Sequence, residues 1–289
     1  MFGDVHGTGT TRKGRGMTPP RNATKSGWGP RLYPWPAPPD EVEHYLPSVT
    51  SVMGVEAKPA VEGWKLKVTG EEVAGMVKSG ALTALVAQDP SLAVNVVKNA
   101  WRSHLDKAGS NGTLVHEYLE AQFKGAPKPE LTPDAEKIVK HANRLLDLYD
   151  VEPLYTECTV YGGLSDVEKT GYAGTLDLIV EMFVPGRGRK RLVADWKTSK
   201  GIYDSMAAQC AAYRYADKLV TGDDGNVVDM PETDGAVIFH IRPEGALAVP
   251  VAADEHAWDY FMAARRLWGA THDKTWRAVY PPLPEIKAA

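Results

Sequence analysis

The sequence lacks the residues and segments that mark several common classes of protein. Only two cysteines, Cys158 and Cys210, occur in 289 residues, too few for a disulfide framework or a four-thiolate zinc or iron–sulfur site. No apolar run approaches the roughly 18 residues that a membrane-spanning helix needs, and no apolar signal core follows the first charged residues. We therefore expect a cytoplasmic protein that does not contact a membrane.

Glycine-rich phosphate-binding loops are also missing, because neither G-x-G-x-x-G nor G-K-[ST] occurs anywhere in the chain. Helicase motifs are absent too. The hydrophobic content of 43% excludes a chain that is disordered throughout, and at this length a full core can form without disulfides or metals. The composition therefore predicts a folded protein that is neither a nucleotide-driven motor nor a dinucleotide-dependent enzyme.

Residues 1–40 differ from the rest of the chain in composition. They hold six basic side chains against two acidic ones, with seven prolines and seven glycines, whereas the remaining 249 residues are net acidic. Such a segment buries too little apolar surface to offset the entropy of ordering its backbone. We therefore expect a disordered basic tail over 1–40, either touching nucleic acid or simply solvated, and one folded domain over 41–289.

The hydrophobic pattern changes period along the chain, from helical spacing to alternation and back. Helices are expected at 71–78, 82–87, 91–105, 113–123, 133–149, 203–220 and 254–272. Strands are expected at 154–161, 172–184, 191–197, 235–242 and 246–251. Ser48 or Thr50 should cap a short helix, Asp254 should cap the last helix, and Asn111-Gly112 should interrupt the chain. This order predicts an α/β fold, a mixed β-sheet flanked by helices with a helical N-terminal part.

Charged residues interrupt two strands that are expected to form a hairpin. Asp177 lies on strand 172–184, and Asp195 and Lys197 share one face of strand 191–197 because they are two residues apart. The opposite face of the second strand carries Leu192, Ala194 and Trp196. Charges within apolar strands are costly unless they pair or bind a cation. The pattern indicates a cation site, with a structural Asp–Lys ion pair as the alternative, and the sequence alone does not set the register.

Four further polar residues lie on neighbouring elements. Glu157 interrupts the strand before the hairpin, and His116 lies on a helix with an apolar side. Gln209 and Tyr213 are one turn apart on the helix after the hairpin and therefore share a face. Each is uninformative alone, since an isolated histidine is more often a core or surface residue than a ligand.

In this order along the chain, the segments resemble the RecB-like branch of the PD-(D/E)XK nuclease superfamily. The matching motifs are Pro47-Ser48-Val49-Thr50 with Trp64, Gly112 to Glu120 around His116, Glu157, Gly174 to Asp177, Asp195 to Ser199, and Gln209 to Tyr213. The resemblance covers about residues 45–220. It implies a restriction-endonuclease-like core.

The resemblance also implies a role for each matching residue. Metal-binding positions fall on His116, Asp177, Asp195 and the backbone carbonyl of Trp196. Lys197 would be the catalytic lysine and Glu157 an acidic residue that supports or extends the site. Gln209 and Tyr213 match a motif that lines the DNA channel. Glu120 either belongs to the site or is a solvated helix residue.

These assignments imply a metal-dependent exonuclease that hydrolyses phosphodiester bonds in phage or bacterial DNA recombination, repair or degradation. Two aspartates and a carbonyl suit Mg²⁺, and the histidine makes Mn²⁺ competitive. A lysine beside the metal can orient or deprotonate the attacking water. Nucleases of CRISPR adaptation in this superfamily carry four cysteines around an iron–sulfur cluster, which two cysteines cannot hold. The chain is more similar to stand-alone phage exonucleases, which work in the cytoplasm of the bacterial host.

The expected partner is DNA, as linear duplex or single-stranded ends, and a single-strand annealing protein or a separate helicase would complete the reaction. Two alternatives share the fold: a DNA-binding recombination protein with weak or no catalysis, and a structure-specific endonuclease. A zinc peptidase is disfavoured because Glu120 stands where the second histidine of such a motif belongs.

Overall fold

A seven-stranded mixed sheet forms the centre of the protein in a computed structural model that describes residues 30–36, 41–221 and 225–272. The strand order is β7-β6-β3-β4-β5-β8-β9, and only the β5–β8 pair is parallel among these neighbours. The strands are β3 (Glu152–Gly162), β4 (Tyr172–Val184), β5 (Gly188–Lys197), β6 (Lys218–Thr221), β7 (Asn226–Asp229), β8 (Gly235–Arg242) and β9 (Gly245–Val251). The predicted mixed sheet flanked by helices is confirmed.

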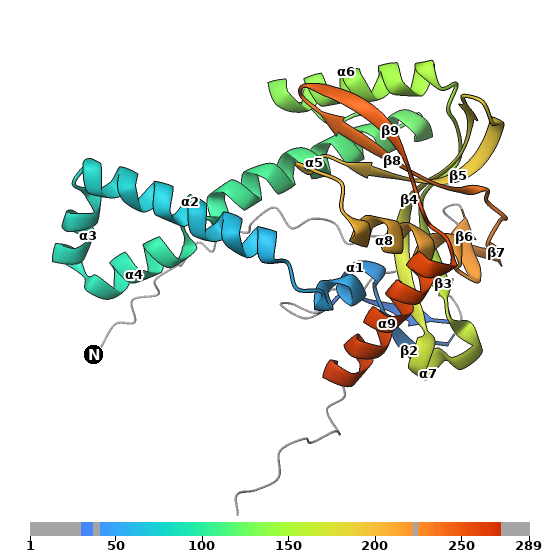
Figure 1. The fold of residues 1–289 in the computed structure, drawn as a ribbon, viewed down its shortest axis with the longest axis horizontal. Coiled ribbons are helices and arrows are strands. Elements are labelled where there is room, and N and C mark those ends of the chain that lie inside the picture. The colour runs from blue at the N-terminus through green and yellow to red at the C-terminus, as the bar shows by residue number, and fades with distance from the viewer. Residues whose placement is uncertain (1–29, 37–40, 222–224, 273–289) are drawn as a thin grey trace, which may run out of the picture.

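Helices cover both faces of this sheet (Figure 1). The helices are α1 (Val49–Val52), α2 (Pro59–Lys78), α3 (Ala81–Gln88), α4 (Pro90–Asn99), α5 (Arg102–Lys124), α6 (Pro133–Leu148), α7 (Val167–Thr170), α8 (Asp204–Arg214) and α9 (Glu255–His272). Two short 3-10 helices, η1 (Met53–Val55) and η2 (Leu164–Asp166), lie beside α1 and α7. One apolar cluster joins α1, α8 and α9 to the sheet, and a second joins α5 and α6 to the other face.

Local signals explain where several helices begin. Ser48 caps α1 by accepting a hydrogen bond from the Ser51 backbone N–H at 3.0 Å, and Asp254 accepts one from Ala257 at 3.1 Å at the start of α9. Thr132 caps α6 in the same way, with a proline at the first helical turn. No helix in the described part of the chain has the length and apolar character needed to cross a bilayer.

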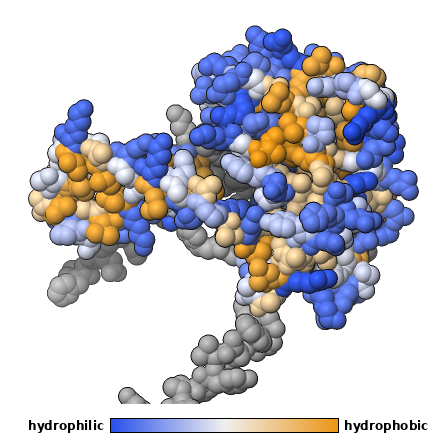
Figure 2. Space-filling view, in the orientation of Figure 1, coloured by the Kyte–Doolittle hydropathy of each residue, from blue (hydrophilic) through white to orange (hydrophobic). Residues whose placement is uncertain are grey.

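Helices α2, α3 and α4 form a lobe that projects from the sheet body (Figure 1). Only Val68 and Ala93 are buried within it, while Leu66, Val77 and Val94 are more than half exposed. Figure 2 shows apolar side chains gathered on this lobe. The helical N-terminal part is therefore confirmed, as a lobe with little core of its own.

Three expectations about element boundaries were wrong. Helix α5 runs without interruption through Asn111 and Gly112, and the helix expected at 91–105 divides into α4 and the start of α5. The helix expected at 203–220 ends at Arg214, and its last residues form β6 instead. Strand β6 pairs with β3, and its β-branched Val220 and Thr221 suit a strand, whereas the alanine-rich run remains helical in α8.

A further correction concerns the N-terminal segment. Residues 32–35 were expected to be disordered, yet they form β1 (Leu32–Trp35), which pairs with β2 (His44–Pro47). Tyr33 is fully buried, and Trp35 stacks against Tyr161 with ring centroids 4.8 Å apart. The expectation for residues 1–29 and 37–40 lies outside the described residues. Removing residues 1–40 would therefore remove a buried strand as well as basic charge.

Candidate active site

A cleft of about 1000 Å³ opens at the middle of the sheet, between β3, β4, β5, α5 and α8. Its walls include eight of the residues singled out in the sequence: His116, Glu120, Glu157, Asp177, Asp195, Lys197, Gln209 and Tyr213. These residues come from five elements that are far apart along the chain. The fold thus brings these eight residues together in one place, whereas Trp64 lies on α2 and does not line the cleft.

The β4–β5 hairpin aligns its two aspartates. Leu178 pairs with Ala194 in the antiparallel register, so continuing that register by one residue sets Asp177 opposite Asp195. Oδ2 of Asp177 accepts a hydrogen bond from the backbone N–H of Trp196 at 2.8 Å. The N–H and the carbonyl of a strand residue point to the same neighbouring strand, so the Trp196 carbonyl also faces β4. The Trp196 side chain packs in the apolar cluster that joins α5 and α6 to the sheet.

The strand pair is irregular where the acidic residues lie. Glu157 has a φ of 50°, a left-handed backbone conformation that is uncommon for a residue other than glycine. Its neighbours Thr156 and Cys158 keep their register with β4. Glu157 alone therefore leaves the pairing of β3 with β4 at this point. Backbone strain of this kind is concentrated at functional sites.

Three side chains converge closely enough to share one cation. Ligand atoms of His116, Glu157 and Asp177 all lie within 4.8 Å of one another, and each residue is half-buried. Nδ1 of His116 lies 3.7 Å from Oδ2 of Asp177. The expected contribution of His116 from α5 thus agrees with the geometry, whereas Asp195 lies outside this group of three.

Asp195 forms an ion pair with Lys197 at the floor of the cleft. Its side chain is only 2% exposed, and that of Lys197 is 19% exposed. Burial raises the pKa of Asp195, with the charge of Lys197 opposing the shift. Burial lowers the pKa of Lys197, but the charges of Asp195 and Asp177 outweigh that effect and raise it overall. Lys197 is therefore held as a cation between two carboxylates, and the ion pair considered from sequence is present within the carboxylate cluster.

Among the carboxyl groups at the cleft, that of Glu157 has the largest shift in pKa. Burial, followed by the negative charges of Asp177 and Glu120, raises its pKa from 4.5 to about 9. In the described part of the chain it has neither a hydrogen-bond nor an ion-pair partner. The protonated form of Glu157 is therefore favoured in the cleft without metal, and a carboxyl shifted this far by burial and neighbouring charge is typical of a functional site.

Helix α8 supplies Gln209 and Tyr213 to the same floor. The Gln209 amide donates to the Tyr213 hydroxyl at 3.1 Å and lies 3.4 Å from Oδ1 of Asp195. Tyr213 is buried against Gly174, where a β-carbon would lie 2.9 Å from its ring. These contacts orient the carboxylate of Asp195. Gln209 and Tyr213 therefore contribute to the cleft by holding that carboxylate in place, and do not project into open solvent.

Helix α5 lines one wall with residues at helical spacing. Thr113, His116, Glu117, Glu120 and Lys124 all reach the cleft. Lys124 is paired with Glu120 at 2.5 Å, so Glu120 is a partly neutralised member of the wall. Both cysteines are buried and neither is in a disulfide, with Cys158 on β3 and Cys210 on α8.

The sequence motifs missed the contribution of β1. Arg31, directly before this strand, and Tyr33 within it both line the cleft. The Tyr33 hydroxyl bonds Thr175 Oγ1 at 3.0 Å, two residues before Asp177 on β4. The short apolar run Leu32–Trp35 inside a proline-rich segment was the only sign of β1 in the sequence. Four residues are too few to show the alternation of a strand.

Comparison with known proteins adds no relative, since no protein-family profile and no curated protein matches the chain. We therefore infer its function from the residues of the cleft.

Proposed function

We propose that the protein is a metal-dependent DNA nuclease with a restriction-endonuclease-like core, acting on linear DNA from its ends. The observation that carries the proposal is the convergence of His116, Glu157 and Asp177 within 4.8 Å, beside the Asp195–Lys197 pair in one cleft. End dependence comes from the resemblance to stand-alone exonucleases.

The donor set fits a divalent cation. Carboxylate oxygens suit Mg²⁺, and one imidazole makes Mn²⁺ a competent substitute. Burial and the charges of Asp177 and Glu120 raise the pKa of Glu157 to about 9, so a cation bound beside it would favour the ionised form and displace the proton. His116, Asp177 and Glu157 would hold the ion, with Asp195 and the Trp196 carbonyl at its edge. The bound ion would withdraw charge from the phosphate and lower the pKa of a coordinated water.

The protein residues have separate tasks in this proposal. Lys197 orients the attacking water and offsets negative charge that develops on the phosphate. Gln209 holds Asp195 in place through its amide. The Trp196 backbone N–H donates to Oδ2 of Asp177, the oxygen that lies 3.7 Å from His116 Nδ1, and so holds this carboxylate at the site. Arg31 contacts a phosphate of the strand, because its side chain lines the cleft without a carboxylate partner among the described residues.

The proposal is tested by incubating the protein with linear duplex, linear single-stranded and covalently closed circular DNA in Mg²⁺. We expect loss of end label from linear DNA, intact circles, and no cleavage in the presence of a chelator. Cleavage of closed circles would favour the endonuclease. Binding without cleavage in either Mg²⁺ or Mn²⁺ would favour the DNA-binding protein of the same fold.

A further inference from the structure

The chain leaves the sheet directly after Lys197, the last residue of β5. Lys197 is the last residue of that strand to pair with β8, where its partner is His240. The carbonyls of the next two residues, both half-buried, then lack strand partners and need other donors. Both are bonded by side chains of β8: Arg242 Nη1 donates to the Thr198 carbonyl at 3.0 Å, and His240 Nε2 lies 2.8 Å from the Ser199 carbonyl.

The two bonds from β8 have different characters. A carbonyl only accepts, so the His240 ring carries its proton on Nε2. Arg242 contacts Thr198 through Nη1, while its Nε lies 3.4 Å from the largely exposed Glu244 carboxylate. Arg242 thus has two contacts that can be removed separately.

The opposite side of the same segment abuts helix α5. A β-carbon at Gly112 would lie 2.9 Å from Thr198 Oγ1, closer than side-chain atoms approach without displacement. His116 lies one turn further along α5, on the same side of the helix. Residues 198–199 are therefore confined between β8 and the helix that carries a proposed metal ligand.

We propose that Arg242 and His240 are positioning residues that fix residues 198–199 and thereby set the location of Lys197 relative to Asp195 and His116. The inference rests on the proposed nuclease function, and neither residue touches DNA or metal in it. A displacement of about 1 Å at a reacting group can cost about 100-fold in rate, so such support has a measurable effect.

Arg242→Ala and Glu244→Gln form the matched pair for the test. Arg242→Ala removes the bond to the Thr198 carbonyl, whereas Glu244→Gln removes only the ionic contact on the solvent side. We expect Arg242→Ala to slow single-turnover cleavage of linear DNA about 10- to 100-fold, with little change in DNA affinity, and Glu244→Gln to match the wild type. Amide hydrogen exchange of residues 196–201 should become faster in Arg242→Ala only.

His240 provides the second pair if Arg242→Ala does not fold. His240→Ala should slow cleavage, while His240→Gln should restore part of the rate because its amide can donate to the Ser199 carbonyl. Wild-type rates and unchanged exchange in Arg242→Ala and His240→Ala would overturn the inference. If the wild type cleaves no DNA, the proposed function fails. Hydrogen exchange then still decides whether β8 holds the segment.

Discussion

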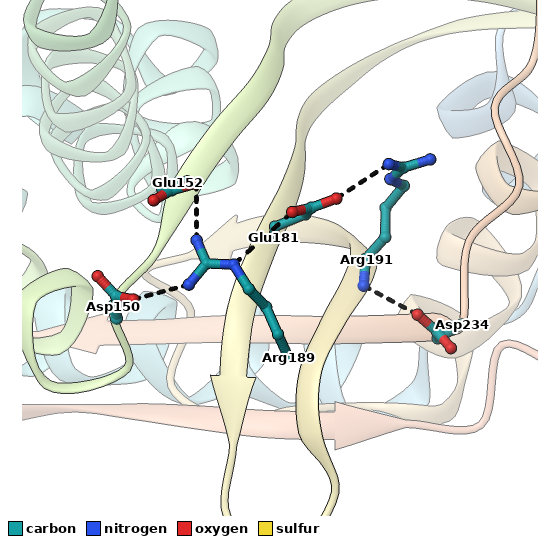
Figure 3. Close-up of polar contacts among 6 residues, drawn as sticks. All are labelled: Asp150, Glu152, Glu181, Arg189, Arg191 and Asp234. Carbon is teal, nitrogen blue, oxygen red and sulfur yellow. Dashed lines mark hydrogen bonds and ion pairs between the residues drawn. The ribbon is translucent and has the colours of Figure 1, made fainter.

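The two ends of the β4–β5 hairpin use the same residue types with opposite outcomes. Near the turn, Arg189 lies between three carboxylates, at 2.7 Å from Asp150, 2.7 Å from Glu152 and 3.6 Å from Glu181 (Figure 3). Arg191 also bonds Glu181, at 2.9 Å. At the other end, Glu157 has no such partner within the described residues. Asp195 and Glu120 are paired there with Lys197 and Lys124, so the difference between the two ends lies in Glu157.

The pKa directions express this difference. The backbone N–H of Arg191 and the ammonium of Lys190 lower the pKa of Asp234 near the turn. Burial and neighbouring carboxylates raise the pKa of Glu157 to about 9 at the cleft. Each carboxylate near the turn has a cationic partner close to the surface, whereas Glu157 is half-buried and has no such partner among the described residues. Pairing and burial therefore distinguish the carboxylates of the two ends better than residue type does.

The largest expected effect is a difference in DNA cleavage rate between variants at the two ends of the β4–β5 hairpin. Asp177→Asn should slow DNA cleavage at least about 100-fold, because a neutral amide replaces a metal-binding carboxylate. Glu181→Gln, at the turn, should cleave at the wild-type rate, although it loses its bonds to the two arginines. Rate measurements on linear DNA decide, and equal rates for the two variants would contradict the comparison.

The ends should also respond oppositely to pH in the metal-free protein. The pKa of Glu157 is about 9 in the fold and 4.5 without it, so between these values the folded state holds an extra proton. Its contribution to stability is full below pH 4.5 and is lost as the pH rises towards 9, with a slope of at most about 1.4 kcal/mol per pH unit. Glu157→Gln should flatten that decline in thermal midpoint.

Asp234 supplies the contrasting control for the pH experiment. Its lowered pKa contributes stability above its unfolded value of 3.8, and that contribution is lost as the pH falls below it. Asp234→Asn should therefore lower the thermal midpoint above about pH 4, leave it unchanged in stronger acid, and so flatten only the decline on the acid side of the profile. A decline above pH 5 that persists in Glu157→Gln would show that another group causes it.

Mg²⁺ or Mn²⁺ should raise the free energy of unfolding by about 2.7 kcal/mol at a hundredfold excess over its dissociation constant. The stabilisation arises because the ion binds only the folded carboxylate cluster. Glu157→Gln should lose most of this increase, while Glu152→Gln near the turn should retain it. Thermal shifts measured with and without a chelator test the prediction, and equal losses in both variants would contradict it.

The smallest expected effect concerns the two guanidinium groups. Arg31→Gln should weaken DNA binding about tenfold and reduce its salt dependence, since one phosphate contact is lost. Arg189→Gln should leave DNA binding unchanged and lower stability only slightly, as is usual for exposed ion pairs. Binding titrations at several salt concentrations measure both. Loss of DNA affinity in Arg189→Gln would show that DNA binds near the turn of the hairpin and contradict binding at the cleft.

Elements with strong local signals could be predicted from the sequence. The expected strands at 172–184 and 235–242 coincide with β4 and β8, and the amphipathic pattern at 133–149 marks α6 to within one residue. Strands β1, β2, β6 and β7 were not predicted, because each has four residues and depends on a neighbour distant in sequence. Short strands of this kind carry too few residues to show a period.

The site divides in the same way. The carboxylates and Lys197 interrupt apolar strands, so the cost of burying charge made them visible in the sequence. Their convergence with His116 required the register and the helix position, which the sequence did not supply. The left-handed conformation of Glu157 left no local signal, and the short apolar run of β1 was the only signal for the position of Arg31. Both depend on contacts between distant segments.

The parallel β5–β8 pair has a consequence for the order in which the chain folds. Residues 192–197 of β5 pair with 235–240 of β8, so about forty residues must follow the lysine before its strand gains its second neighbour. During synthesis the N-terminal part leaves the ribosome first, and pairing between distant strands is the slow step. We expect β3, β4 and β5 to pair early, while the edge of β5 that later binds β8 is still unpaired. The cleft would then be completed only after β8 emerges. A nascent chain that ends before β8 would then carry every proposed catalytic residue without a finished site.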